Sequence, residues 1–167
     1  MLWPKYLTII KVGGKIIEEE NTLFKLLNDF SKIEGAKVFV HGGGRLATGF
    51  ILFLSPLTHD RKGTLLNTNA DTIAGETAKT SAKSFDVTLV FCFEKNGVLY
   101  DEQDDNSVIP QINRDMFEEY KNQGIIQGGM LPKLKNSFHA MEAGVRQVII
   151  TNASEINSGK GTIISNG

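Results

Sequence analysis

The chain has 167 residues, and its 18 lysines and arginines nearly balance its 19 aspartates and glutamates, so that the formal net charge is −1. This balance argues against a basic protein that binds nucleic acid. Hydrophobic residues make up 41% of the chain and charged residues 22%, which is typical of a globular protein with a core of ordinary size. We therefore expect a single domain over residues 1–167.

The single cysteine and the short apolar runs limit the cellular setting. Cys92 is alone, so neither an intrachain disulfide nor a cysteine-based zinc cluster can form, and we expect a cytoplasmic protein. The longest apolar run, Phe50 to Leu54, is far below the roughly 20 residues that a membrane span needs. The N-terminus also lacks the apolar stretch and cleavage site of a signal peptide.

The first elements predict a β, α, β order. Leu7 to Val12 is a β-rich run that stops at Gly13-Gly14, and apolar residues recur at helical spacing from Glu18 to Glu34. Gly35 is expected to end this helix. Lys37 to Val40 then predicts a second strand.

The connection to the third predicted strand is unusually short. Only Arg45 to Gly49 separate the glycine-rich end of the second strand from a third strand expected at Phe50 to Ser55. A parallel crossover needs about a dozen residues or more. Either the two strands are antiparallel neighbours or a segment is missing between them.

The rest of the chain alternates helices and strands. After a turn-rich stretch at Thr58 to Gly63, Asn69 is expected to cap a helix in which alanines repeat every four residues from Ala70 to Ala82. That small-residue stripe suggests close packing on a sheet. Further strands are expected at 87–93, 147–151 and 161–165, and further helices at 114–123 and 131–143. The alternation predicts an α/β sandwich with a mostly parallel sheet.

Two glycine clusters follow predicted strands, Gly13-Gly14 and Gly42-Gly43-Gly44. Both would lie at the carboxyl edge of the sheet, where ligands bind. Glycine has no Cβ, so its N–H group can approach an anion closely, and a helix behind the turn adds a favourable dipole. Two such turns predict a polyphosphate site. The simpler alternative is that the glycines merely end the strands.

Three charged residues are candidates to act on a phosphate. Lys11 lies inside an apolar strand, where a charge is costly without an anionic partner. Lys133 lies near the start of a predicted helix, where the dipole favours anions. Asp71, in the first turn of the small-residue helix, could hold the two lysines in register. The alternatives are lysines that reach solvent and an aspartate that only complements the dipole.

Other chemistry has weaker support. Gly42, Gly44 and Ala47 match the dinucleotide fingerprint of an oxidoreductase, but neither a following helix nor the strand position fits, and the Walker pattern is absent. No metal cluster is predicted, because His41, His59 and His139 lack the spacing of zinc ligands. Cys92, inside a strand, is expected to be an inert core residue, and His139 a residue on a helix surface.

Four motifs together resemble the amino acid kinase family. They are Ile10 to Gly14 (IKVGG), His41 to Arg45 (HGGGR), Leu66 to Asp71 (LNTNAD) and Gly128 to Lys133 (GGMLPK). Four motifs in the right order over most of the chain are far more specific than any one of them. Within the family, the chain is most similar to the branch that acts on N-acylated glutamate.

The resemblance implies a three-layer sandwich and a homodimer that transfers a phosphoryl group from ATP, with Mg²⁺, to the side-chain carboxylate of an N-acylglutamate in arginine biosynthesis. Lys11 and Lys133 would neutralise the phosphoryl group, and Asp71 would orient both lysines. Backbone N–H groups of four glycines would bind phosphate: Gly13, Gly14, Gly43 and Gly44. Asn67, Asn69 and Arg45 would face the acylated amino acid. The adenosine end of the nucleotide would lie near Glu94, Gly97, Gly129 and Met130.

The chain departs from the family in two places. Glu94 to Gly97 differs from the Asp-x-x-Gly pattern that is common there. Between Arg45 and Phe50, the helix, the substrate lid and the Asn-Gly-x-Arg segment of the family are absent. We expect an incomplete N-terminal lobe at 1–48, for phosphate and acylglutamate, and a lobe at 49–167 that contacts substrate and nucleotide. The alternatives are a sister kinase of the family and a truncated, catalytically weak nucleotide-binding module.

Overall fold

The computed structural model describes residues 5–41, 52–54, 57–59 and 65–165. The strands are β1 (Tyr6–Val12), β2 (Ala36–His41), β3 (Leu52–Leu54), β4 (Leu57–His59), β5 (Leu65–Asn67), β6 (Asp86–Phe93), β7 (Gln111–Ile112), β8 (Gln147–Asn152) and β9 (Thr162–Ile164). The helices are α1 (Gly14–Glu18), α2 (Glu20–Lys32), α3 (Ala70–Ser81), α4 (Arg114–Asn122), α5 (Met130–Glu142) and the 3₁₀ helix η1 (Ala153–Glu155).

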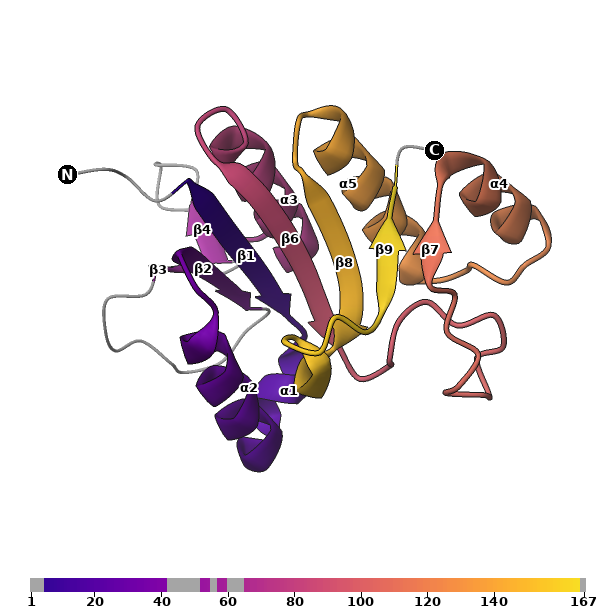
Figure 1. The fold of residues 1–167 in the computed structure, drawn as a ribbon, viewed down its shortest axis with the longest axis horizontal. Helices are drawn as coiled ribbons and strands as arrows, with labels where there is room; N and C mark the ends of the chain where they lie inside the picture. The colour runs from indigo at the N-terminus through magenta and orange to yellow at the C-terminus, as the bar shows by residue number, and fades with distance from the viewer. Residues whose placement is uncertain (1–4, 42–51, 55–56, 60–64, 166–167) are drawn as a thin grey trace.

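Seven of the described strands form one sheet in the order β3-β2-β1-β6-β8-β9-β7. The five strands from β3 to β8 run parallel, whereas β9 is antiparallel to β8 and pairs in parallel with β7. Parallel strands bring their carboxyl ends to one edge of the sheet, which Figure 1 shows for β1, β6 and β8. The expected mostly parallel sheet is confirmed, and its carboxyl edge is where ligands bind in such folds.

Helices cover both faces of the sheet. One hydrophobic cluster packs β1, β6 and β8 against α3, α4 and α5, and a second packs the other face of β1 and β6 against α1 and α2. Figure 1 shows α3 and α5 behind the sheet. Strand β1 alternates between the layers, since Ile9 belongs to the first cluster and Ile10 and Val12 to the second. The described residues thus form the expected three-layer sandwich.

The alanine stripe of α3 explains how closely this helix approaches the sheet. Ala70, Ala74 and Ala78 are buried in the first cluster, as the four-residue spacing predicts. Small side chains leave little between the helix backbone and the strands. The first turn of α3 therefore lies close to β1 and β6.

Strand β3 pairs with β2 in parallel, with Val38 opposite Leu52 and Val40 opposite Leu54. The antiparallel alternative for these strands is therefore wrong. Only residues 42–51, which lie outside the described residues, connect them, and a parallel crossover ordinarily needs about a dozen residues or more and a helix. The pairing therefore favours the other alternative, a segment missing from this connection.

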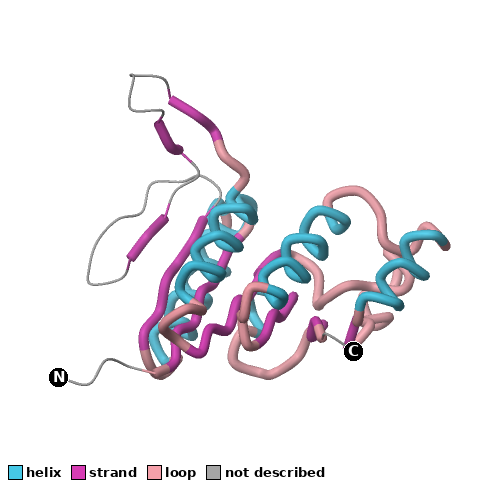
Figure 2. Tube along the Cα trace, turned by 90° about the horizontal axis from the view of Figure 1, so that it is seen from above, coloured by secondary structure: helices cyan, strands magenta, loops and turns pink. Residues whose placement is uncertain are grey.

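Local structure differs from the sequence prediction in three places. The helix expected at 18–34 is present as α2, but a short helix that was not predicted, α1, precedes it, and the extended backbone of Glu19 (φ −96°, ψ 101°) separates the two. Strand β4 overlaps the start of the turn-rich stretch expected at 58–63, β5 follows that stretch, and the two pair in antiparallel fashion. Figure 2 shows this pair beyond the N-terminal end of α3. The short strand β7 was also not predicted, because two residues carry no periodic signal. No described helix has the length and apolarity to cross a membrane.

Candidate functional site

Three charged side chains from distant parts of the chain meet near the carboxyl edge of the sheet. Lys11 is the second-last residue of β1, Asp71 lies in the first turn of α3, and Lys133 lies at the start of α5. The Lys11 ammonium lies 2.6 Å from Asp71 Oδ1, and the Lys133 ammonium donates to Asp71 Oδ2 at 2.9 Å. One carboxylate thus bridges two lysines, and the structure brings together the three residues that the sequence predicted to act as a unit.

The three side chains are largely shielded from water. Their exposed fractions are 12% for Lys11, 13% for Asp71 and 10% for Lys133. A solvated lysine is thus excluded for both cations, and so is an Asp71 that only complements the dipole of its helix. Ion pairs in such surroundings are screened far less than pairs on an open surface.

Helix caps fix the positions of Asp71 and Lys133. Asn69 is the N-cap of α3, as predicted, and its Oδ1 accepts the N–H of Asp71 at 2.8 Å. At α5, Gly128 has φ +53°, a conformation that glycine adopts without strain, and Gly129 is the N-cap residue. Pro132 is the third residue of α5, where an N–H would have no partner within the helix. These caps start both helices beside the same edge.

The electrostatics of the cluster favour an anionic ligand. Burial by itself would raise the pKa of Asp71, but the charges of Lys133 and Lys11 and their hydrogen bonds outweigh it and lower this pKa. Burial lowers the pKa of Lys133 below the ordinary lysine value, although the Asp71 carboxylate partly opposes this shift. Two cations and one anion leave a net charge of +1, at the end of a helix whose dipole also attracts anions. The cluster can therefore hold a phosphate or a transferring phosphoryl group.

Of the two predicted glycine turns, only Gly13-Gly14 lies among the described residues. The Gly13 N–H donates to the Cys92 carbonyl at 3.1 Å, so in this structure it ties β1 to β6 and is not directed to a ligand, contrary to the expected role. Gly14 is the first residue of α1, so its N–H has no acceptor within that helix. Gly43, Gly44 and Arg45 lie outside the described residues.

The predicted substrate residues lie just before α3. Asn67 is the last residue of β5, of which only the backbone is described. Asn69 is exposed, and its side-chain oxygen serves the helix cap. This engagement gives Asn69 a structural role in addition to any contact with substrate.

The residues expected at the adenosine end separate into two groups. Gly97 is buried, and a Cβ there would lie 2.8 Å from Thr162 Oγ1 and 2.9 Å from Val108 Cγ1, so close packing alone requires this glycine. Glu94 pairs with Lys15 at 3.3 Å and accepts Asn152 at its backbone carbonyl. Gly129 is exposed, with no atom within 4 Å of an added Cβ, and Met130, the first residue of α5, is partly buried.

The remaining predictions concern thiol and metal chemistry. Cys92 is fully buried, and desolvation raises the pKa of its thiol to about 12, as expected of an inert core residue. His139 is exposed on α5, as predicted. Among the described residues, no three His, Cys, Asp or Glu side chains are grouped to hold a metal ion. Both oxygens of Asp71 face lysines, so this carboxylate is not available to a metal.

Two aromatic residues beside the cluster were not predicted. Phe91 and Phe93 of β6 lie against the Lys133 ammonium, with ring centroids 5.0 and 5.7 Å from its Nζ. In the sequence they appear only as part of an apolar strand, and nothing in that pattern indicates a distant lysine. Their role follows from packing between β6 and α5.

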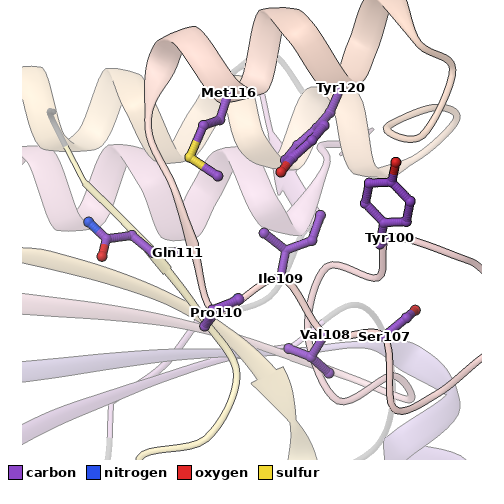
Figure 3. A pocket seen from close by; sticks show the side chains of 8 residues that line it. All are labelled: Tyr100, Ser107, Val108, Ile109, Pro110, Gln111, Met116 and Tyr120. Atoms are coloured by element: carbon purple, nitrogen blue, oxygen red, sulfur yellow. The ribbon is translucent and has the colours of Figure 1, made fainter.

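A separate apolar pocket of about 520 Å³ lies between α4 and residues 107–111 (Figure 3). Tyr100 and Tyr120 meet edge to face there, with ring centroids 6.0 Å apart, and Met116 points toward Ile109 and Pro110. None of the residues predicted to act on phosphate or nucleotide lines it. It is therefore distinct from the lysine cluster.

Comparison with known proteins yields close relatives. The model of the amino acid kinase family matches residues 45–152. An acetylglutamate kinase of Parabacteroides distasonis is 43% identical over 249 aligned positions, which cover 93% of this chain and 98% of the relative. One of Cytophaga hutchinsonii is 52% identical over 244 positions, covering 90% and 92%. The solved carbamate kinase from Giardia lamblia bound to AMP-PNP has a TM-score of 0.70 at 11% identity, covering 96% and 98%, and supports the fold alone.

The alignments also reveal an internal gap. The alignment with the Parabacteroides protein spans 249 positions, whereas the chain has 167 residues, so at least 82 positions of the relative have no counterpart here. Because the alignment covers nearly all of both chains, these positions lie within it rather than at its ends. This confirms the expected absence of an internal segment. The chain is a kinase fold with that segment missing, and it belongs to the amino acid kinase family.

Proposed function

We propose that this kinase transfers the γ-phosphoryl group of ATP to the side-chain carboxylate of N-acetylglutamate or another N-acylglutamate, a step of arginine biosynthesis. The observation that carries the proposal is the bridge from Lys11 through Asp71 to Lys133 at the carboxyl edge of the sheet. Relatives that are 43% and 52% identical and are named acetylglutamate kinase support the choice of substrate.

The chemistry needs charge neutralisation more than a base. A carboxylate is already a nucleophile, so positioning and electrostatic stabilisation account for catalysis of phosphoryl transfer. Lys11 and Lys133 approach from two elements, so that together they can neutralise charge on opposite sides of the transferring group. Asp71 holds both ammonium groups in place and limits their mutual repulsion.

Magnesium would enter with the nucleotide. The described residues offer no cluster of acidic ligands for it, and Mg²⁺ is commonly held by substrate phosphates together with few protein groups. When bound, Mg²⁺ neutralises charge on the phosphates of the nucleotide. The residues of this chain then orient the acceptor and the transferring group.

The missing segment favours a second candidate function. If the segment is absent from the expressed protein, the lysine cluster persists, while the part of the N-terminal lobe at 1–48 that would surround acylglutamate is incomplete. The chain would then bind ATP without acylglutamate-dependent turnover. The division into lobes at 1–48 and 49–167 remains a prediction. The homodimer is also a prediction, and the mass of the protein in solution would test it.

The test combines intact mass with turnover on one sample. A mass well above 18.4 kDa would show that the expressed protein contains the missing segment. Together with ATP turnover that depends on N-acetylglutamate or N-succinylglutamate, it would support the proposed kinase activity. A mass of 18.4 kDa with ATP binding and no acylglutamate-dependent turnover would replace the proposal by the nucleotide-binding module.

A further inference from the structure

The ammonium group of Lys133 is enclosed by two aromatic rings and one carboxylate. Its Nζ lies 5.0 Å from the ring centroid of Phe91 and 5.7 Å from that of Phe93, and it donates to Asp71 at 2.9 Å. Phe91 and Phe93 are two residues apart in β6, so they lie on the same face of the sheet. Both distances are within the range of cation–π attraction.

The enclosure occupies the centre of the candidate site. Phe91 has no exposed surface and is the register partner of Lys11, so one strand pair places a ring beside both lysines. Phe93 follows toward the carboxyl end of the strand and is partly buried. A lysine has a flexible four-carbon stem, and a single hydrogen bond restricts it little. The rings restrict the ammonium on the side of β6 and exclude water there, while the side chain keeps 10% of its surface exposed.

We propose that Phe91 and Phe93 are positioning residues that hold the Lys133 ammonium against Asp71 in the geometry required for phosphoryl transfer. The kinetic effects expected of this positioning rest on the proposed function, whereas the contacts of Lys133 do not. The rings do not touch the reacting atoms. They act through Lys133, by stabilising its charged form in a site that is poorly solvated and by limiting its rotamers.

The test substitutes the ring and then restores it. Phe93→Leu keeps an apolar side chain but removes the π face, and Phe93→Tyr keeps the face. We expect Phe93→Leu to lower kcat about threefold to tenfold, with the KM for ATP nearly unchanged, and Phe93→Tyr to retain most of the activity. Phe91→Leu should have an effect at least as large, because its ring is nearer and fully buried. Phe30→Leu is the matched control, since this buried phenylalanine belongs to the cluster on the opposite face.

The pH profile gives a readout that a packing role would not change. The groups that act on Lys133 are Asp71 of α3, Lys11 of β1 and the Cys92 thiol of β6. Loss of a ring removes a contact that stabilises the charged form of Lys133, so the pKa of this lysine should fall. The alkaline limb of kcat, where Lys133 would lose its proton, should therefore move to lower pH by about half a unit to one unit. The tyrosine variant and Phe30→Leu should leave this limb in place.

The ring contacts can also be measured without turnover. Protons on the carbon next to the Lys133 ammonium, which lies 5.0 and 5.7 Å from the two ring centroids, should have displaced NMR resonances, and Phe91→Leu and Phe93→Leu should each reduce the displacement. If Phe91→Leu and Phe93→Leu both keep the kcat, the alkaline limb and the Lys133 resonances of the unmodified protein, the positioning role is wrong. If the protein shows no acylglutamate-dependent turnover at all but the resonances respond as expected, the proposed function fails while the positioning of Lys133 stands.

Discussion

Asp71 and Lys133, 62 residues apart in the chain, are joined at 2.9 Å by an ion pair that links the first turns of α3 and α5. The second oxygen of the same carboxylate faces Lys11 at 2.6 Å. A carboxylate that serves two cations can hold them close together only while it is charged. The geometry of this cluster and part of the stability of the fold therefore depend on the ionisation state of Asp71.

Replacing Lys133 by alanine should reduce turnover far more than nucleotide affinity. In the proposed mechanism the ammonium group stabilises charge that develops during transfer, and removal of one such group typically costs about 10²–10³ in kcat. Steady-state kinetics and ATP titration measure the two effects separately. Lys135→Ala is the matched control, because Lys135 is exposed on the same helix. Unchanged turnover in Lys133→Ala would contradict its role in transfer.

Replacing Asp71 by asparagine should reduce both turnover and stability. The two ammonium groups would then face each other without a counter-charge, and loss of one partner of a buried ion pair costs about 3 kcal/mol or more, less where water reaches the pair. Chemical denaturation measures the free energy of unfolding. Asp115→Asn is a close control, since Asp115 follows the cap residue Asn113 of α4 by two positions, as Asp71 follows Asn69, but is exposed. Equal stability of the two variants would contradict this account.

The contribution of Asp71 to stability should disappear in acid. Its folded-state pKa is lowered, chiefly by Lys133 and Lys11 acting against burial, so the folded state binds this proton less readily than the unfolded chain. The stabilisation is complete above the unfolded pKa of about 3.9 and is lost as pH falls through the lower folded value. The Tm difference between the unmodified protein and Asp71→Asn should therefore be constant near neutral pH and shrink below about pH 4. A Tm difference that grows in acid would mean that the pKa of Asp71 is raised in the folded state, which would contradict this prediction.

Two glycines at the predicted adenosine end should respond differently to alanine. Gly97→Ala would place a methyl group 2.8 Å from Thr162 Oγ1, which accepts the Val98 N–H and donates to the Ile109 carbonyl, so we expect a loss of about 1–3 kcal/mol. Gly129→Ala meets no atom within 4 Å, so stability should change little. Thermal unfolding and ATP titration on both variants separate packing from binding. Weaker ATP binding in Gly129→Ala at unchanged Tm would support its nucleotide role.

The layers of this protein and the members of its charged cluster could be predicted from the amino-acid sequence. The apolar runs at 7–12 and 87–93 predicted buried parallel strands, and the alanines from Ala70 to Ala82 predicted a helix close to the sheet. Lys11 was recognisable because a charge inside an apolar strand needs an anionic partner. Short-range periodicity and capping suffice for such predictions, because they depend on neighbours in the chain.

The way in which distant groups are combined followed from the three-dimensional packing. It made β2 and β3 parallel and engaged the Gly13 N–H with the Cys92 carbonyl. It also placed Phe91 and Phe93 around Lys133 and required Gly97 for packing against Thr162. Each of these depends on contacts between residues far apart in sequence. The free energy of such contacts belongs to pairs of surfaces, so the pattern along either segment does not reveal it.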